Sequence, residues 1–240
     1  MVFGAVRPIG RAALTIPRCI VFDMDGTIIN SSPLHLEAWT GVTRRVDPSC
    51  LLRATPQIMG HTSEDTVKLL GLPKCRTREI VEMKIGMYDE MIKAQLLKGP
   101  ESDIIVPGFR SFFDSLKGFS RGLATAAIRD EAEFVLSSIG ILNGLNAVVT
   151  ASEFTKNKPD PEPYLMTLEK LGCIDMPHQC VGFEDTLMGV QAVKAAGMKC
   201  VVVGTSLTPA LLQEAGQPYD LFIPDYTHID LPRLSLLFSL

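Results

Sequence analysis

The sequence predicts an α/β fold with a doubly wound parallel sheet and a helical domain inserted near its beginning. From residue 108 onward, short apolar runs alternate with helical patterns, which is the order of elements in a βαβ sheet. A further apolar run precedes them at residues 19–23. Residues 31–106 interrupt the alternation, because they show helical spacing and no convincing strand pattern.

Each apolar run is assigned to one strand and each amphipathic segment to one helix. The expected strands are residues 19–23, 121–125, 146–150, 180–184, 199–204 and 220–223. The helices expected after the insertion are residues 108–117, 130–139, 161–171, 186–196 and 208–215. We therefore divide the chain into an α/β core of residues 1–30 and 107–240 and a helical insertion of residues 31–106.

Composition narrows the classes of partner. The chain has 240 residues, of which 46% are hydrophobic, enough for a full α/β core and one inserted domain. The net charge is −4 and no basic stripe is visible, so we expect no nucleic-acid partner. No apolar run approaches the length of a membrane span, so we expect no membrane partner. We expect a monomer or a weak dimer.

The cysteines show neither a CxxC pair nor the Cys/His spacing of a metal site. They are Cys19, Cys50, Cys75, Cys173, Cys180 and Cys200. Three of them lie in or beside apolar runs, as buried cysteines that behave as small apolar side chains do. We therefore expect reduced thiols in an intracellular, cytoplasmic protein.

The first 18 residues leave a second localisation open. They contain Arg7, Arg11 and Arg18 and no acidic residue. An arginine-bearing, acid-free leader is typical of organellar transit peptides. The same segment is equally compatible with a short extension that covers the edge of the sheet.

Two aspartates, Asp23 and Asp25, come at the end of the first apolar run and precede a Gly-Thr turn. Because ligands bind at the carboxyl edge of open α/β sheets, both side chains are expected at a ligand site. Neighbouring carboxylates repel each other unless a cation lies between them or one of them holds a proton. The pattern therefore indicates either a chemical site or a solvated junction, since Asp and Gly are common turn residues.

Three further patterns follow the aspartates in chain order. Gly122–Thr125 is an apolar run that ends in a hydroxyl, Lys158 begins a Lys-Pro-Asp-Pro loop, and Val181–Asp185 ends in paired acids. With the two aspartates, they resemble the four motifs of the haloacid dehalogenase-like hydrolase superfamily, from Cys19 to about Val203. The resemblance implies that the predicted sheet is a Rossmann-like core of that superfamily.

The resemblance also implies a phosphoryl-transfer site that requires Mg²⁺. Asp23 would attack phosphorus and bind the metal, and the backbone carbonyl of Asp25 would be a second ligand. Asp185 would be a third ligand, with Glu184 beside it or reached through water. The alternative for Asp185 is an N-cap of the helix expected at 186–196.

The other motif residues would move protons and neutralise charge. Asp25 would act as general acid and base, a role that we expect to need a pKa above that of Asp23. Thr125 would donate a hydrogen bond to a phosphoryl oxygen, unless its hydroxyl only caps the following turn. Lys158 would offset negative charge on the nucleophile and the phosphate, unless it is a solvated loop residue.

Residues 30–39 resemble the β-phosphoglucomutase and sugar-phosphate phosphatase branch, which implies that 31–106 is a helical cap. His35 matches a histidine that faces the active site, although it could equally be packed against the core. Ser63 falls where the mutase carries an arginine for the second phosphate. Lys84 and Arg129 are candidates for contact with the substrate or for ordinary surface charges.

The motifs favour a Mg²⁺-dependent phosphatase of small phosphorylated metabolites, with sugar or polyol phosphates preferred. The serine at position 63 makes a phosphosugar mutase the second choice, because a bisphosphate needs a cationic clamp. The aspartate at position 25 argues against a dehalogenase, which lacks it. A binding protein on this fold is the remote alternative.

Overall fold

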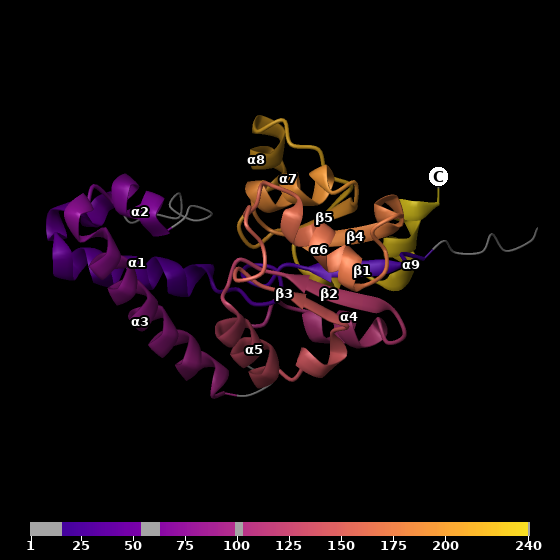
Figure 1. The fold of residues 1–240 in the computed structure, drawn as a ribbon, viewed down its shortest axis with the longest axis horizontal. Helices are drawn as coiled ribbons and strands as arrows, with labels where there is room; N and C mark the ends of the chain where they lie inside the picture. Colours follow the sequence, from indigo (N-terminus) through magenta and orange to yellow (C-terminus); the bar gives the residue numbers. More distant parts are fainter. Residues whose placement is uncertain (1–15, 54–62, 99–102, 240) are drawn as a thin grey trace, which may run out of the picture.

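The computed structural model describes residues 16–53, 63–98 and 103–239 (Figure 1). Within this part of the chain, one parallel sheet has the strand order β3-β2-β1-β4-β5-β6. The strands are β1 (Cys19–Phe22), β2 (Ser120–Ala124), β3 (Ala147–Val149), β4 (Cys180–Glu184), β5 (Lys199–Val203) and β6 (Leu221–Ile223). The order runs outward in both directions from β1, so the predicted doubly wound sheet is confirmed.

Helices cover both faces of the sheet, as the alternation along β1 requires. Ile20 and Phe22 belong to the apolar core on one face, whereas Cys19 and Val21 belong to the core on the other. The first face is covered by α4 (Phe109–Ser115), α5 (Arg129–Ser138) and α9 (Leu231–Ser235). The second is covered by α6 (Glu162–Lys170), α7 (Leu187–Ala195) and α8 (Pro209–Glu214). The predicted helices of the core are confirmed to within two residues at each end.

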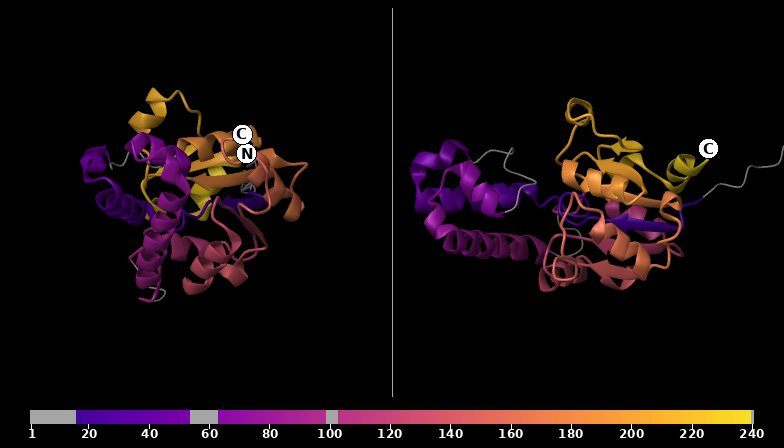
Figure 2. Two further views of the ribbon diagram at one scale, coloured as in Figure 1. Left: turned by 60° about the vertical axis from the view of Figure 1, so that its left-hand side comes forward. Right: turned by 45° about the horizontal axis from the view of Figure 1, so that its top comes forward.

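Three helices between β1 and β2 lie apart from the sheet, on the left in Figure 1, and the right-hand view of Figure 2 shows the same separation. They are α1 (Ser32–Val46), α2 (Ser63–Leu70) and α3 (Thr77–Leu96). Their shared apolar core includes Trp39, Val67 and Ile80. The helical character expected for this segment is therefore confirmed for its described residues.

The two connections between these helices and the sheet run side by side. Ile29 forms an antiparallel bridge with Ile105. The Asn30 N–H donates to the Ile104 carbonyl at 2.6 Å, and the Val106 N–H donates to the Ile28 carbonyl at 3.0 Å. This pairing holds the start of α1 beside the carboxyl end of β1, where the aspartates lie. Residues 99–102, which precede the second connection, lie outside the described residues.

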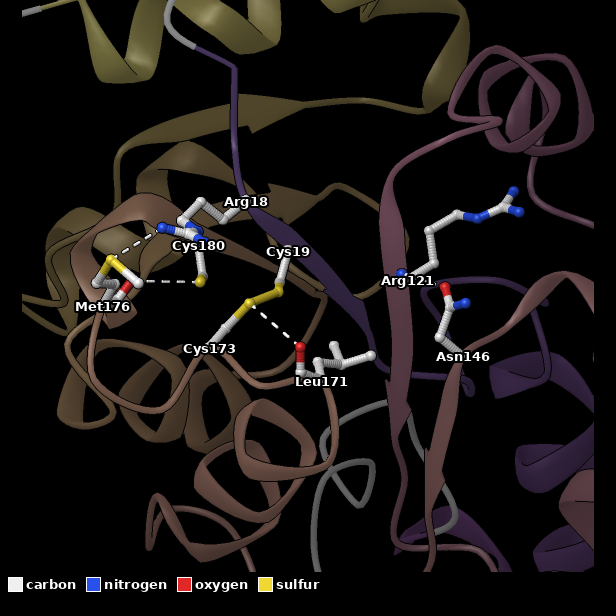
Figure 3. The surroundings of a disulfide bond; sticks show 8 residues. All are labelled: Arg18, Cys19, Arg121, Asn146, Leu171, Cys173, Met176 and Cys180. Carbon is white, nitrogen blue, oxygen red and sulfur yellow. Dashed lines mark hydrogen bonds between the residues drawn. A yellow bond between two sulfur atoms is a disulfide. The ribbon is translucent and has the colours of Figure 1, made fainter.

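The cysteine prediction is wrong for one pair, because Cys19 and Cys173 form a disulfide (Figure 3). Cys19 begins β1, Cys173 follows α6, and their Cα atoms are 6.8 Å apart. A third cysteine, Cys180, lies close to this pair and keeps a free thiol, which donates to the Met176 carbonyl at 3.4 Å. A sequence separation of 154 residues carries no pairing signal, so only the fold brings these sulfurs together.

Cys173→Ser is expected to lower the melting temperature of the oxidised protein. A disulfide that closes so long a loop restricts the unfolded chain, and it typically contributes about 2–4 kcal/mol. In a protein of this size that corresponds to roughly 5–15 °C, measured by scanning calorimetry without reductant. Cys75→Ser, at an exposed free cysteine, is the matched control. Equal melting temperatures for wild type and Cys173→Ser without reductant would contradict the pairing.

No helix among the described residues combines the length and the apolar character needed to cross a membrane. Residues 1–15, which contain Arg7 and Arg11 of the arginine-bearing leader, lie outside the described part of the chain. The expectations on organellar import and on compartment therefore stay predictions.

Candidate active site

Polar side chains from three neighbouring strands meet at the carboxyl edge of the sheet. Asp23 follows β1, Thr125 follows β2, and Asp185 follows β4. β1 lies between β2 and β4, so these side chains converge on one place. They line a cavity of about 590 Å³ together with Asp25 and Lys158. The fold thus brings all the predicted motif residues into a single site.

Lys158 bridges two of the buried acids. Its Nζ donates to Asp23 Oδ1 and to Glu184 Oε1, both at 2.6 Å. Burial alone would lower the pKa of this ammonium, but the charges of Asp23 and Glu184 outweigh burial and raise it. The lysine therefore stays charged in the site, and the alternative of a solvated loop residue is excluded by its burial.

Hydrogen bonds and close packing fix the carboxylate of Glu184. Its Oε1 also accepts a hydrogen bond from Tyr164 Oη at 2.9 Å, and its Oε2 accepts from the Asp185 N–H at 3.0 Å. A Cβ at Gly189 on α7 would lie within 2.0 Å of both carboxylate oxygens, so only glycine fits there. Sequence analysis missed Tyr164 and Gly189. Both lie in amphipathic helices, where a tyrosine or glycine gives no sign of contact with a catalytic acid.

Asp185 is not an N-cap. The cap of α7 is Thr186, whose Oγ1 accepts from the Gly189 N–H at 3.1 Å. Asp185 Oδ2 accepts from Thr205 Oγ1 at 3.3 Å, whereas the buried Oδ1 has no hydrogen-bond partner in the described part of the chain. Gly26 makes room for this carboxylate, because a Cβ there would lie 1.9 Å from Oδ2.

The acids fit a divalent cation. Asp23, Glu184 and Asp185 each offer a buried carboxylate oxygen, and these oxygens lie within 4.8 Å of one another. Burial and the charge of Glu184 raise the pKa of Asp23 to about 7, although Lys158 opposes the shift. Burial and both neighbouring acids raise the pKa of Asp185 as well. These carboxylate oxygens repel one another, and Asp185 Oδ1 accepts no hydrogen bond in the described part of the chain. Mg²⁺ prefers oxygen ligands of this kind.

Asp25 faces the inserted helices instead of the acid cluster. Its Oδ1 accepts from Ser31 Oγ at 2.6 Å and from Tyr88 Oη at 3.3 Å. Burial raises the pKa of Asp25, but the nearby His35, Ser31 and Tyr88 outweigh burial and lower it. The expected order of pKa values is therefore reversed, because Asp23 lies among acids and Asp25 among hydrogen-bond donors.

His35 links Asp25 to α3. Lys84 Nζ lies 2.8 Å from His35 Nδ1, and since an ammonium only donates, Nδ1 accepts and Nε2 carries the ring proton. Nε2 lies 3.7 Å from Asp25 Oδ1. The ring of Tyr88 stacks on His35 with centroids 4.0 Å apart. The structure thus places His35 and Lys84 in the site, and it adds Tyr88, which sequence analysis missed.

The hydroxyl residues Thr125 and Ser63 were both predicted to lie at the site. Thr125 Oγ1 accepts from the Ala127 N–H at 3.1 Å, so the hydroxyl caps the turn and its proton remains free to donate into the cavity. Ser63, the first residue of α2, lines the cavity as well. Gly60–Thr62, which precede it, lie outside the described residues.

Arg129 does not line the cavity, which corrects its assignment as a substrate-binding residue. Its guanidinium donates to Glu133 Oε1 at 2.9 Å, to the Val148 carbonyl at 3.2 Å and to Glu153. These acceptors lie beside α5 and β3, and they turn the side chain away from the acids. The first turn of α5 directs Glu131 into the cavity instead.

Glu153→Gln is expected to destabilise the protein at neutral pH and much less in acid. Burial raises the pKa of Glu153, but Lys170, the Thr150 N–H and Arg129 outweigh burial and lower it to about 2. The folded pKa lies below the ordinary value of 4.5, so the stabilisation is complete above pH 4.5 and is lost toward pH 2. We expect a loss of about 1–3 kcal/mol near neutrality.

Urea unfolding of wild type and variant at about pH 7 and about pH 3 measures this difference. Glu169→Gln, at an exposed position on α6, is the control. A difference between wild type and Glu153→Gln that is the same at both pH values would refute the assignment.

Asp23, which could act as a nucleophile, lies among acids that could bind a metal, at the carboxyl edge of a parallel sheet where α/β enzymes bind their ligands. The chain matches the haloacid dehalogenase-like hydrolase family over residues 20–203, and it belongs to that family. It is therefore a hydrolase, and its curated relatives include several that are named as phosphatases.

Two of these relatives cover most of the chain. Validoxylamine A 7'-phosphate phosphatase of Streptomyces hygroscopicus subsp. limoneus is 29% identical over 220 residues, which are 89% of this chain and 96% of the relative. Fructose-1-phosphate phosphatase of Escherichia coli (strain K12) is 28% identical over 199 residues, 77% and 95% of the two chains. A crystal structure of β-phosphoglucomutase from Clostridium difficile shares the fold, with a TM-score of 0.74, 21% identity and coverage of 93% and 98%.

Proposed function

We propose that this hydrolase is a Mg²⁺-dependent phosphatase of small phosphorylated metabolites, with sugar or polyol phosphates preferred, that works through an aspartyl phosphate. The observation that carries the proposal is the lysine bridge: Lys158 holds Asp23 beside Glu184 in the cavity that Asp25 also lines. The names of the two relatives, each a phosphatase of a phosphorylated small molecule, support the choice of substrate class.

Charge is the first obstacle for an aspartate that attacks a phosphate dianion. Two like charges 4 Å apart repel by about 4 kcal/mol at an effective dielectric constant of 20. The ammonium of Lys158, 2.6 Å from Asp23, offsets part of this repulsion and would stabilise the charge that spreads over the phosphoryl oxygens. Thr125 would donate its free hydroxyl proton to one of those oxygens.

Asp23, Asp185 and the backbone carbonyl of Asp25 would hold Mg²⁺, with Glu184 beside it or reached through water. When bound, the metal would supply positive charge that offsets the carboxylates and the substrate phosphate. Asp25, whose pKa is lowered by its hydrogen-bond donors, would first have to take up a proton; it would give this proton to the leaving alcohol and then take one from the water that hydrolyses the aspartyl phosphate. Its position between Ser31, Tyr88 and His35 orients the carboxyl for both transfers.

The three helices α1 to α3 would form a cap that excludes water and selects the leaving group. Residues of α1 and α3, among them His35, Lys84 and Tyr88, line the same cavity as the acids. We propose that the protein acts on a small-molecule substrate, that it binds neither nucleic acid nor membrane, and that it is a monomer or a weak dimer.

Phosphate release from a panel of phosphorylated metabolites, with Mg²⁺ and with excess EDTA, tests the proposal. We expect turnover of several sugar or polyol phosphates that is lost in EDTA and restored by Mg²⁺. Turnover that persists unchanged in EDTA would contradict the metal requirement. Interconversion of hexose 1- and 6-phosphates without net phosphate release would show a mutase, and a folded protein that turns over nothing would favour a binding protein.

A further inference from the structure

Part of the cavity wall carries acidic and apolar side chains to which the proposed phosphate reaction assigns no role. Asp89 and Ile85 of α3 line it together with Ile128 and Glu131 at the start of α5. These residues lie where the inserted helices face the core, next to Asp25, the proposed proton donor to the leaving group. They are therefore placed to contact the alcohol portion of a substrate.

Two carboxylates on this part of the wall have no counterion of their own. Glu131 and Asp89 form no hydrogen bond or ion pair within the described part of the chain. Burial raises the pKa of Glu131 to about 7, and the charges of Asp25 and Asp89 act in the same direction, while Lys84 opposes them. Glu131 and Asp89 are both half-buried, and a half-buried carboxylate with acidic neighbours is stabilised by a cation that arrives with the substrate.

Few lysines or arginines among the described residues face these two acids. Lys84 contacts His35 Nδ1 at 2.8 Å, and it is a single ammonium facing Asp25, Asp89 and Glu131. Lys158 is committed to Asp23 and Glu184, and Arg129 points away from the cavity. The further acid on the cavity wall, Asp65, is paired with Lys68 at 2.7 Å.

Apolar surface adjoins the two acids. Ile85 is 48% exposed and Ile128 is 60% exposed, although both are large apolar side chains on the cavity wall. They would pack against carbon atoms of a leaving group, while the acids would accept hydrogen bonds from its polar end. A second phosphate on the substrate, in contrast, would meet two carboxylates and only one shared lysine.

We propose that the leaving group of the preferred substrate carries a protonated amine, which Glu131 and Asp89 bind, so that the enzyme acts on phosphate monoesters of amino sugars or amino alcohols. This inference rests on the proposed phosphatase function and specifies its substrate class. A charge-assisted hydrogen bond contributes about 1.5–3 kcal/mol, which corresponds to roughly a tenfold to hundredfold preference for the amine.

Matched pairs of esters that differ only in an amine or a hydroxyl test the inference. The pairs are glucosamine 6-phosphate with glucose 6-phosphate, and O-phosphoethanolamine with 2-hydroxyethyl phosphate, with p-nitrophenyl phosphate as a generic substrate. We expect wild type to prefer the amine of at least one pair in kcat/KM. Glu131→Gln and Asp89→Asn should each reduce that preference about tenfold or more, chiefly through KM.

Glu133→Gln is the matched control, because Glu133 lies two residues further along α5 and pairs with Arg129 outside the cavity. Its preference should equal that of wild type. The inference would be overturned if wild type hydrolyses p-nitrophenyl phosphate but prefers the amine in neither pair. It would also be overturned if wild type prefers the amine and both Glu131→Gln and Asp89→Asn keep the same preference. Either result would leave the phosphatase proposal intact. Absence of phosphate release from every ester would overturn both.

Discussion

Asp23→Asn is expected to abolish phosphate release, by a factor of about 10⁴ or more, and to prevent formation of the covalent phosphoenzyme. The amide cannot attack phosphorus as a carboxylate does, and no other carboxylate takes the same position. Glu184 is held by Lys158 and Tyr164, and Asp25 is turned toward Ser31. Acid-quench trapping with labelled substrate measures the covalent intermediate.

The same substitution is expected to leave the fold intact. Asparagine keeps an oxygen that can accept from Lys158, and it removes one of three carboxylates that repel one another. The melting temperature of the metal-free variant should therefore not fall below that of metal-free wild type. Asp114→Asn, at an exposed acid of α4 that pairs with Lys117, is the control, and its covalent intermediate should be trapped as in wild type. A normal phosphoaspartate in the Asp23 variant would refute the assignment of the nucleophile.

Asp25→Asn is expected to slow both chemical steps by about 10²–10⁴-fold, because the amide cannot donate a proton to the leaving alcohol or accept one from water. The aspartyl phosphate should still form on Asp23, but slowly, and it should also decay slowly. Asparagine can keep the acceptor that Ser31 and Tyr88 contact, so the contact between α3 and the residues that follow β1 should persist.

Rapid-quench kinetics separate the two steps for this variant. A leaving group that needs no protonation, such as p-nitrophenol, should restore much of the rate of phosphoenzyme formation but not that of its hydrolysis. If both rates in Asp25→Asn match wild type with an alkyl phosphate, Asp25 is not the proton carrier. Full rescue of both steps by the better leaving group would also contradict its second role as a base.

Most of the fold could be predicted because its signals are local. The strands of the sheet are short apolar runs, and the alternation along β1 places Ile20 and Phe22 on one face and Val21 on the other. Parallel strands need crossover helices, so the order of elements in the sequence already implies the doubly wound sheet. The helical spacing within residues 31–106 predicted helices in the insertion in the same way, and α3 (Thr77–Leu96) is one of them.

Contacts between distant segments could not be predicted. Cys19 and Cys173 pair only because α6 returns its carboxyl end to the start of β1. Tyr164 and Gly189 support Glu184 from two different helices, and neither carries a signal in its own neighbourhood. Each of these contacts depends on how helices pack on the sheet, which the local pattern of apolar residues does not specify.

The sequence by itself determined the class of the enzyme and the residues of its acid centre, because Asp23, Asp25, Thr125, Lys158 and Asp185 follow or adjoin strands whose carboxyl ends meet at one edge. Only the tertiary structure decided their electrostatics. Asp23 lies among acids and Asp25 among donors, so the pKa of the first is raised and that of the second lowered. The same holds on the wall of the cavity, where Arg129 donates to Glu133, the Val148 carbonyl and Glu153, whereas Glu131 lines the cavity. The strength and direction of a charge interaction depend on distance and burial, which exist only once the chain has folded.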